Sequence, residues 1–198
     1  MPINSKVSEF LDRIQQGIRP NMFLCEFQFP TAGAPASTDI NLVNILCKSA
    51  ALPASNLGVI EVPFRGRVVK IAGDRTFDTW TATFINDKDF KIRQFMEKWM
   101  ENINKHEDNT AIAIVPEVST GYTGNIIVKQ LERDASPGGG IVRQYKLWDV
   151  FPTNISQIDL AYDSNDQIED FTVEFQYQYW TIESVSYTHL TLPTNREV

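Results

Sequence analysis

The sequence has little of the residues on which most catalytic and metal sites depend. Its 198 residues include two histidines, His106 and His189, and two cysteines, Cys25 and Cys47. A structural zinc site needs about four Cys or His ligands, and a nucleophilic triad needs a base beside the nucleophile. His106 lies in the polar run 104–108, which is typical of a solvated surface. The sequence therefore offers no His cluster for zinc and no triad with more than one possible base.

The motifs of phosphate, calcium and acid–base sites are missing as well. No Gly-Lys-Ser/Thr follows the glycines 138–140, so this run is a flexible turn and not a phosphate loop. The polar run 163–167 lacks the central glycine and the final glutamate of a calcium loop. Glu169 and Asp170 are adjacent, so they point to opposite faces if they lie on a strand. We predict no catalytic residue, no cofactor and no bound metal, and an enzyme function has no positive support.

Long hydrophobic runs are also absent. No apolar run approaches the ~20 residues of a membrane span, and the N-terminus lacks the basic and apolar regions of a signal peptide. These absences predict a protein that is made in a cytoplasm and has no membrane partner. In a cytoplasm Cys25 and Cys47 are expected to be free, buried thiols rather than a disulfide.

The charge of the chain is negative and unevenly distributed. A net charge of −7, from 25 acidic and 18 basic residues, argues against wholesale electrostatic binding to nucleic acid. Residues 149–180 contain no Lys or Arg. Their acidic residues are Asp149, Asp159, Asp163, Asp166, Glu169, Asp170 and Glu174. The excess charge thus belongs to one C-terminal segment, and the rest of the chain is balanced.

The last residues do not resemble the end of a domain. The run 185–194, Val-Ser-Tyr-Thr-His-Leu-Thr-Leu-Pro-Thr, resembles a translated transposon-end sequencing adapter. We therefore expect a single domain at 1–183, followed by a non-native or disordered tail at 184–198. A genuine flexible tail is the alternative, and neither version carries a function.

Apolar periodicity in the first half predicts a short helix and several strands. Val7, Phe10, Leu11 and Ile14 recur at helical spacing within 5–16. Arg65-Gly66 separates two apolar strands and predicts a hairpin. The strands expected in this half are 22–29, 42–48, 58–64, 67–72 and 77–85, with a loop at 30–38.

A long helix is expected to begin at Asn86. Asn86 can cap it, and Asp87 and Asp89 would place negative charge in its first turn, where the helix dipole favours it. Its apolar stripe of Ile92, Phe95, Met96, Trp99 and Ile103 is typical of core packing rather than of a cofactor site.

The second half of the chain is predicted to be mostly strand. The segments expected are 111–115, 124–132, 140–150, 156–162 and 171–180. A polar turn at 163–166 predicts that the last two pair as a hairpin. In the final strand the residues Phe171, Val173, Phe175, Tyr177 and Tyr179 alternate with polar ones, as in a strand with one buried face. Together, the expected strands and helices predict a mainly β fold, a sandwich or barrel with one long and one short helix.

Three blocks of sequence carry a resemblance to a known family. The first is Arg19-Pro20-Asn21. The second runs from Lys48 through Ala51-Leu52-Pro53-Ala54 and Ala72-Gly73-Asp74-Arg75-Thr76-Phe77-Asp78-Thr79-Trp80 to Asn86-Asp87. The third comprises Leu147-Trp148, Phe151-Pro152-Thr153-Asn154-Ile155, Asp163-Ser164-Asn165 and Gln178-Tyr179-Trp180. In order and spacing these blocks resemble the tail tube proteins of contractile-tailed bacteriophages over nearly all of 7–180. The segments 31–39 and 104–110 look longer than in that family, and the tail beyond Glu183 has no counterpart there.

The resemblance implies both an architecture and a role. It implies two packed β-sheets flanked by a helix, hexameric rings that stack, and inner sheets that join into a barrel around a channel. The implied partners are other copies of the chain, the tail sheath, baseplate and tail-terminator proteins, the tape-measure protein, and DNA in transit. The implied location is the virion tail, assembled in the host cytoplasm. Open strand edges agree with this role, since pairing in a closed ring removes an aggregation hazard.

Two sets of residues are candidates for this role. We expect the hairpin and the charged turn after it to contact a neighbouring subunit or ring through Arg65, Arg67, Lys70, Asp74 and Arg75, although Gly73-Asp74-Arg75 could merely set the chain direction. Opposite charge in the acidic segment would then fix the docking register. We expect the channel to be lined by Gln157, Asp159, Thr172, Glu174, Gln176 and Gln178. An ordinary solvent-facing exterior is the alternative for this second set.

Two other functions agree with the same sequence features. A tube protein of a type VI secretion or related contractile injection apparatus would share the fold, and neighbouring capsid and terminase genes would distinguish it. A monomeric β-barrel that binds a small ligand is less favoured. It would show no rings or filaments in negative-stain images.

Overall fold

The computed structural model describes residues 7, 10, 14, 17–30, 37–111, 116, 121–132, 140–163 and 165–183. Most of the predicted helix at 5–16 and of the predicted strand at 111–115 lies outside this set, as does the tail at 184–198. The elements in chain order are β1 (Phe23–Gln28), α2 (Ser37–Ile45), β2 (Cys47–Ala50), β3 (Asn56–Phe64), β4 (Arg67–Thr76), β5 (Trp80–Ile85), α3 (Lys91–Ile103), β6 (Gly124–Leu131), β7 (Ile141–Ile155), β8 (Asp170–Gln176) and β9 (Tyr179–Glu183).

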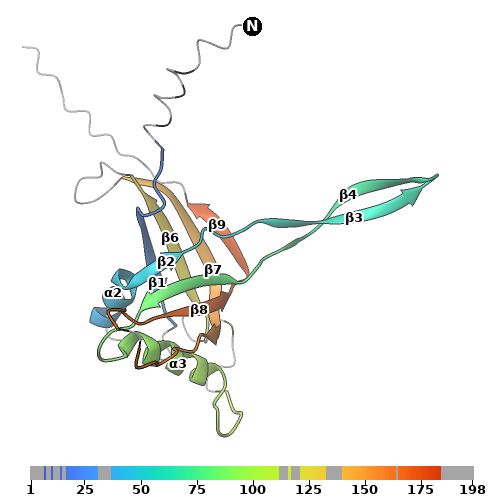
Figure 1. The fold of residues 1–198 in the computed structure, drawn as a ribbon. Helices are drawn as coiled ribbons and strands as arrows, with labels where there is room; N and C mark the ends of the chain where they lie inside the picture. Colours follow the sequence, from blue (N-terminus) through green and yellow to red (C-terminus); the bar gives the residue numbers. More distant parts are fainter. Residues whose placement is uncertain are drawn as a thin grey trace, which may run out of the picture.

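The strands form two packed layers that share β7 (Figure 1). We call the layer β1-β6-β7-β9 sheet I and the layer β7-β8-β5-β2 sheet II; every pairing in both is antiparallel. The long hairpin β3–β4 is separate from both. The predicted mainly β fold of two packed sheets with a flanking helix is therefore confirmed.

One long strand, β7, passes from the first sheet to the second. Its residues 144–148 pair with β9 in sheet I, and its residues 151–155 pair with β8 in sheet II. Between them Asp149 has a φ of 53°, which bends the strand. The prediction ended this strand at Val150, before Pro152. Proline is tolerated there because β7 is the edge strand of sheet II, where no ladder bond requires its missing N–H.

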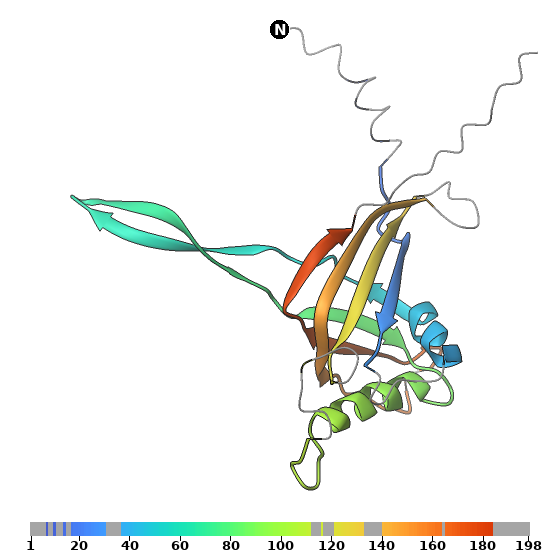
Figure 2. The same ribbon diagram turned by 180° about the vertical axis from the view of Figure 1, so that it is seen from behind.

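The core lies between the two sheets and is rich in aromatic rings. Phe27 of sheet I packs against Trp80, Phe84 and Phe175 of sheet II, with ring centroids 5.5–6.4 Å apart. Helix α3 lies across one end of the sandwich, and α2 lies beside β1 (Figure 2). The α3 side chains Ile92, Met96 and Trp99 are buried, so the predicted core role of that stripe is confirmed.

Helix α3 begins later than the sequence suggested. Asn86 does not cap it; its side chain donates to Glu169 (2.9 Å) and its backbone N–H to the Glu169 carbonyl (2.9 Å). The residue before the helix is Phe90, with a φ of 55°. The Asp87 carboxylate accepts from the backbone N–H of Ile92 at 3.4 Å and satisfies one free donor of the first turn.

Two predicted strands are wrong. The segment 42–48 belongs mostly to α2, with β2 starting only at Cys47, and 156–162 forms no strand. The expected hairpin between 156–162 and the last strand is therefore wrong too. The last strand is itself divided, into β8 and β9. Strand β8 already has β5 on one side and β7 on the other, so no edge remains for residues 156–162 to pair with.

Cys25 and Cys47 are buried, free thiols, as predicted. A hydrogen bond with Cys47 raises the pKa of the Cys25 thiol, and burial raises it further. A protonated, inaccessible thiol is a poor nucleophile. This pair therefore belongs to the packing of the core.

Gly124 gives a test of the close packing at the end of the sandwich nearest α3. A Cβ at this position would lie 2.4 Å from the Gln28 carbonyl oxygen and 3.2 Å from the Trp99 ring. We expect Gly124→Ala to lower the free energy of unfolding by about 1–3 kcal/mol, because the backbone at Gln28 must move to make room for the new Cβ. Urea denaturation measures this. The control Lys98→Ala, on the exposed side of α3, should change it by less than about 0.5 kcal/mol.

Candidate functional site

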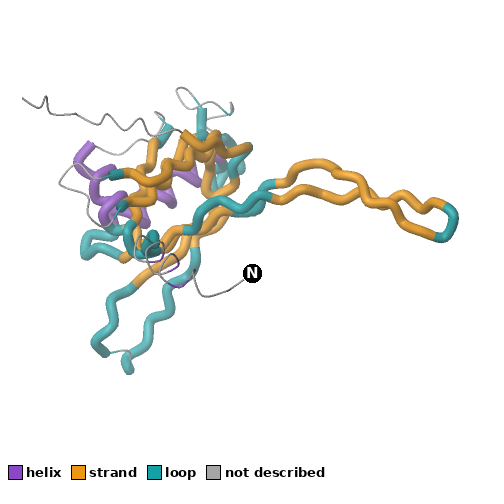
Figure 3. The backbone as a smooth tube through the Cα atoms, turned by 90° about the horizontal axis from the view of Figure 1, so that it is seen from above, coloured by secondary structure: helices purple, strands orange, loops and turns teal. Residues whose placement is uncertain are grey.

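The most distinctive surface is the hairpin β3–β4, which extends far beyond the sandwich (Figures 1 and 3). Its turn, Arg65-Gly66, has positive φ at both residues (44° and 82°), as type I′ hairpin turns require. We call residues 56–76 the arm. The predicted hairpin is confirmed, and it is longer than expected at its base, where β3 begins at Asn56 and β4 ends at Thr76.

Large apolar side chains on both faces of the arm are exposed. Their exposed fractions run from 42% to 61%. They are Leu57, Val59, Ile60, Val62, Phe64, Val68, Val69 and Ile71. A two-stranded hairpin is marginally stable in water on its own. Contiguous exposed apolar surface of this kind marks an interaction site.

The predicted contact residues are spread along the arm rather than gathered at one point. Arg65 and Arg67 lie at the tip, where the Arg65 guanidinium stands 5.4 Å from the centre of the Phe64 ring. Lys70 pairs across the hairpin with Glu61 at 3.6 Å, so its charge is partly matched within the chain. Neither tip arginine forms an ion pair with a described residue.

Asp74 and Arg75 lie at the base of the arm, away from the tip. Arg75 donates to the Ser55 hydroxyl at 3.2 Å. The Asp74 carbonyl oxygen would lie 3.1 Å from a Cβ at Gly58, so the two strands are pressed together here. The expected charged turn at Gly73-Asp74-Arg75 is wrong, because these residues belong to β4. Their contacts agree with the alternative role, in which they set the direction of the chain as it leaves the sandwich.

The outward face of sheet II carries polar side chains that stand in register across β5 and β8. Thr172 and Glu174 stand opposite Thr83 and Thr81, and the Thr83 and Thr172 hydroxyls are 3.1 Å apart. At the next position the Gln176 amide donates to Thr79 at 2.8 Å. The inward face of the same strand is buried, so the predicted alternation is confirmed through Tyr177 but not at exposed Tyr179. Thr172, Glu174 and Gln176 therefore share one surface.

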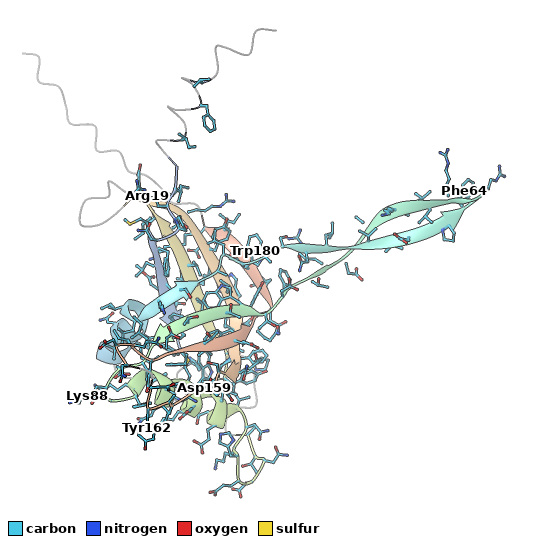
Figure 4. All side chains as sticks on the ribbon, viewed as in Figure 1. Arg19, Phe64, Lys88, Asp159, Tyr162 and Trp180 are labelled. Atoms are coloured by element: carbon cyan, nitrogen blue, oxygen red, sulfur yellow. The ribbon has the colours of Figure 1, made fainter. Side chains whose placement is uncertain are left out.

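The other three predicted channel residues lie elsewhere. Gln157 and Asp159 belong to the loop between β7 and β8, and the Gln157 amide donates to Asp159 at 3.2 Å. Figure 4 shows Asp159 and Tyr162 far from Trp180 and from the arm tip at Phe64. Gln178 lies after β8, where its backbone N–H donates to the Trp148 carbonyl. The prediction that Gln157 and Asp159 continue the β8 face across a hairpin is wrong, because that hairpin does not exist.

The outward face of sheet I differs in charge from that of sheet II. It carries Lys129, paired with Glu26, and Lys146, whose amine stands 3.7 Å from the centre of the Trp148 ring. On sheet II, Lys48 of β2 pairs with Asp170, the first residue of β8. Sequence reasoning did not anticipate this difference, because it did not place Lys129 and Lys146 on one sheet.

The described residues were also compared with the requirements of a metal site and of a membrane-spanning helix. Among them no group of three or more His, Cys, Asp or Glu side chains is arranged to hold a metal ion. In the same residues, no helix is long and apolar enough to cross a membrane. The surfaces that stand out are the arm and the outward faces of the two sheets.

The sequence and the fold both match known proteins. A family model described as phage tail tube protein matches residues 18–183. The chain belongs to the phage tail tube protein family. Among tail tube proteins, gp19 of Enterobacteria phage T4 is 32% identical over 162 residues, which are 82% of this chain and 90% of that protein. The tail tube protein of Serratia phage KSP90 is 28% identical over 174 residues, 86% of this chain and 93% of that one.

Solved structures share the tail tube fold. A chain of the anti-feeding prophage baseplate has a TM-score of 0.60 at 14% identity, covering 84% of this chain and 95% of its own. A chain from the sheath/tube terminator of an extracellular contractile injection system has a TM-score of 0.58 at 13% identity, covering 85% and 97%. At 14% and 13% identity, the similarity of these two structures to the chain shows a shared fold and nothing more.

Proposed function

We propose that this tail tube protein has a purely structural role, in which copies of the chain assemble into stacked hexameric rings around a channel for the genome. The observation that carries the proposal is the arm. Eight large apolar side chains project into solvent on a two-stranded hairpin, and contact with another copy of the chain would remove them from water. Covering about 50 Å² of apolar surface contributes roughly 1 kcal/mol, so burying the whole arm would strongly favour assembly.

The edges of both sheets support ring closure. Among the described strands, β1 and β9 pair on one side only in sheet I, as do β2 and the 151–155 part of β7 in sheet II. Such edges leave N–H and C=O groups able to pair with another copy, and a closed ring leaves no edge unpaired. Helix α2 partly protects β1, because the Asn44 side chain accepts from the Phe27 backbone N–H at 3.1 Å.

The channel wall in this proposal is the outward face of sheet II. Each Lys or Arg that contacts a phosphate releases counterions and strengthens binding, so a wall rich in such contacts would hold DNA back. Sheet II offers threonines, Gln176 and Glu174, whereas sheet I carries Lys129 and Lys146. Thr172, Glu174 and Gln176 are retained from the predicted lining; Gln157, Asp159 and Gln178 are not on this face.

The remaining partners follow from the role. A tube of this kind contacts the tail sheath along its outside, the baseplate and tail terminator at its ends, and the tape-measure protein and DNA within. It is built in the host cytoplasm and becomes part of the virion tail. The tube of an injection apparatus remains the second candidate, favoured by the fold shared with the anti-feeding prophage baseplate chain. Neighbouring capsid and terminase genes distinguish the two.

Direct imaging tests the proposal. The purified chain ending at Glu183 should form rings or longer tubes in negative stain, if necessary after addition of a baseplate-like nucleus. Because assembly is an association between copies of the chain, the assembled fraction should increase with protein concentration. A monomer at all concentrations in analytical ultracentrifugation, with no rings or filaments in any condition, would contradict the proposed function.

A further inference from the structure

A second apolar surface lies on the loop between β7 and β8. Its two limbs, 157–162 and 167–170, enclose an open groove of ≈ 730 Å³. Leu160 is 83% exposed and Ile168 is 76% exposed, and Tyr162 is fully exposed on the same loop. Figure 3 shows this loop projecting from the sandwich on the side away from the arm. Apolar side chains this exposed on a monomer indicate an interaction surface.

The base of this loop is fixed, so the groove has a defined position. Ser156 exchanges two hydrogen bonds with Thr172, and its carbonyl accepts from Arg93 of α3 at 3.1 Å. On the other limb Glu169 is held by Asn86, and Asp170 by Lys48. The rim residues Leu160, Tyr162 and Ile168 extend from this anchored base.

The loop is also acidic. Between residues 157 and 170 it carries Asp159, Asp163, Asp166, Glu169 and Asp170, and no Lys or Arg. Asp163 and Asp166 form no ion pair with a described residue. A partner for this surface should therefore present apolar side chains together with positive charge.

The arm tip has this combination. Phe64 and Val68 are 61% and 55% exposed, and Arg65 and Arg67 beside them lack carboxylate partners among the described residues. The tip and the groove lie at opposite ends of the molecule (Figure 4), so they cannot meet within one chain. Two complementary surfaces placed in this way form a head-to-tail interface, which builds rings or open stacks.

We propose that the arm tip, residues 62–68, of one copy docks in the groove formed by 157–162 and 167–170 of another copy. This inference rests on the proposed function and names the surface that receives the arm. Phe64 is the apolar anchor against Leu160, Tyr162 and Ile168. Arg65 and Arg67 meet the loop carboxylates, which fixes the register and disfavours other docking positions.

Cross-linking between two chains, each with one added exposed cysteine, tests the inference. Chains with Val68→Cys are mixed with chains carrying Ala161→Cys and treated with a short bismaleimide after assembly. Both positions are exposed, whereas Cys25 and Cys47 are buried. We expect the covalent heterodimer to be at least tenfold more abundant than from the control mixture of Val68→Cys with Arg19→Cys. Arg19 is exposed and lies on the far side of the sandwich from the groove (Figure 4).

The outcomes separate the inference from the function on which it rests. Rings or tubes in negative stain without a selective Val68–Ala161 product overturn the docking site and leave the tube role intact. Equal cross-linking to Ala161→Cys and Arg19→Cys overturns it as well. Failure of the unmodified chain to assemble at all rejects the proposed function and the docking site together.

Discussion

A chain in which Asn-Gly replaces residues 58–74 is expected to fold normally and to form no tubes. Leu57 and Arg75 are paired neighbours across the arm, so a two-residue type I′ turn can join them there. No core residue lies in the deleted segment. The truncated chain therefore keeps the whole sandwich and loses the apolar surface that drives association. Sedimentation should show a monomer at concentrations at which the unmodified chain forms tubes.

A matched control keeps the arm and changes only its turn. Replacing Arg65-Gly66 by Asn-Gly preserves the positive φ values and removes one charge. This variant should still assemble, with a threshold concentration raised by less than about tenfold. Denaturant midpoints of both variants should match that of the unmodified monomer. Tubes of normal length from the truncated chain would show that the sheet edges suffice and that the arm serves another purpose.

The arm could be predicted from the sequence because its signal is local. Arg65-Gly66 divides two runs of β-branched residues, and a hairpin needs no distant partner to fix its register. The projection of the arm into solvent, beyond the sandwich, could not be predicted in the same way. Whether Val59, Ile60 or Val69 faces a core or solvent depends on what lies beside the strand, and that is a property of the fold.

Helix α2 was missed for a different reason. Leu42, Val43, Ile45 and Leu46 form a short apolar run, which suits a buried strand as well as a helix. In the structure Val43 is buried while Ile45 is 76% exposed. Val43 reaches the core from the helix, and Asn44 turns toward the edge of β1. These tertiary contacts stabilise a helix where the short apolar run suits either structure, and the sequence alone does not reveal them.

The loop 156–170 shows how an error in pairing moves a candidate site. Ile158, Leu160 and Tyr162 alternate as in a strand, yet both edges of β8 are already occupied, by β5 and by the preceding strand β7. Of the three apolar residues, Ile158 packs on the core, while Leu160 and Tyr162 remain in solvent. The alternation is present, but Leu160 and Tyr162 lie at an exposed groove. The polar residues Gln157 and Asp159 lie in the same loop and belong to no sheet.

Reversing the charge of Glu174 should slow DNA ejection from assembled particles. Glu174 stands opposite Thr81 on the outward face of sheet II, which we propose as the channel wall. Each subunit of each ring would add one lysine facing the genome, so Glu174→Lys creates many weak phosphate contacts along the tube. We expect tails of normal length and ejection at least tenfold slower, measured by the fluorescence of a dye that binds released DNA.

Two further variants and the salt concentration make this test specific. Glu174→Gln removes the charge without adding a cation and should eject at the normal rate. Glu101→Lys makes the same charge reversal on the exposed side of α3, off both sheets and outside the proposed docking surfaces, and should also leave ejection unchanged. Because counterion release weakens as salt increases, a rise from about 50 to about 200 mM should restore much of the rate in Glu174→Lys particles. A slow rate that salt does not change would point to distorted rings, and a normal rate would mean that DNA does not pass along this face of sheet II.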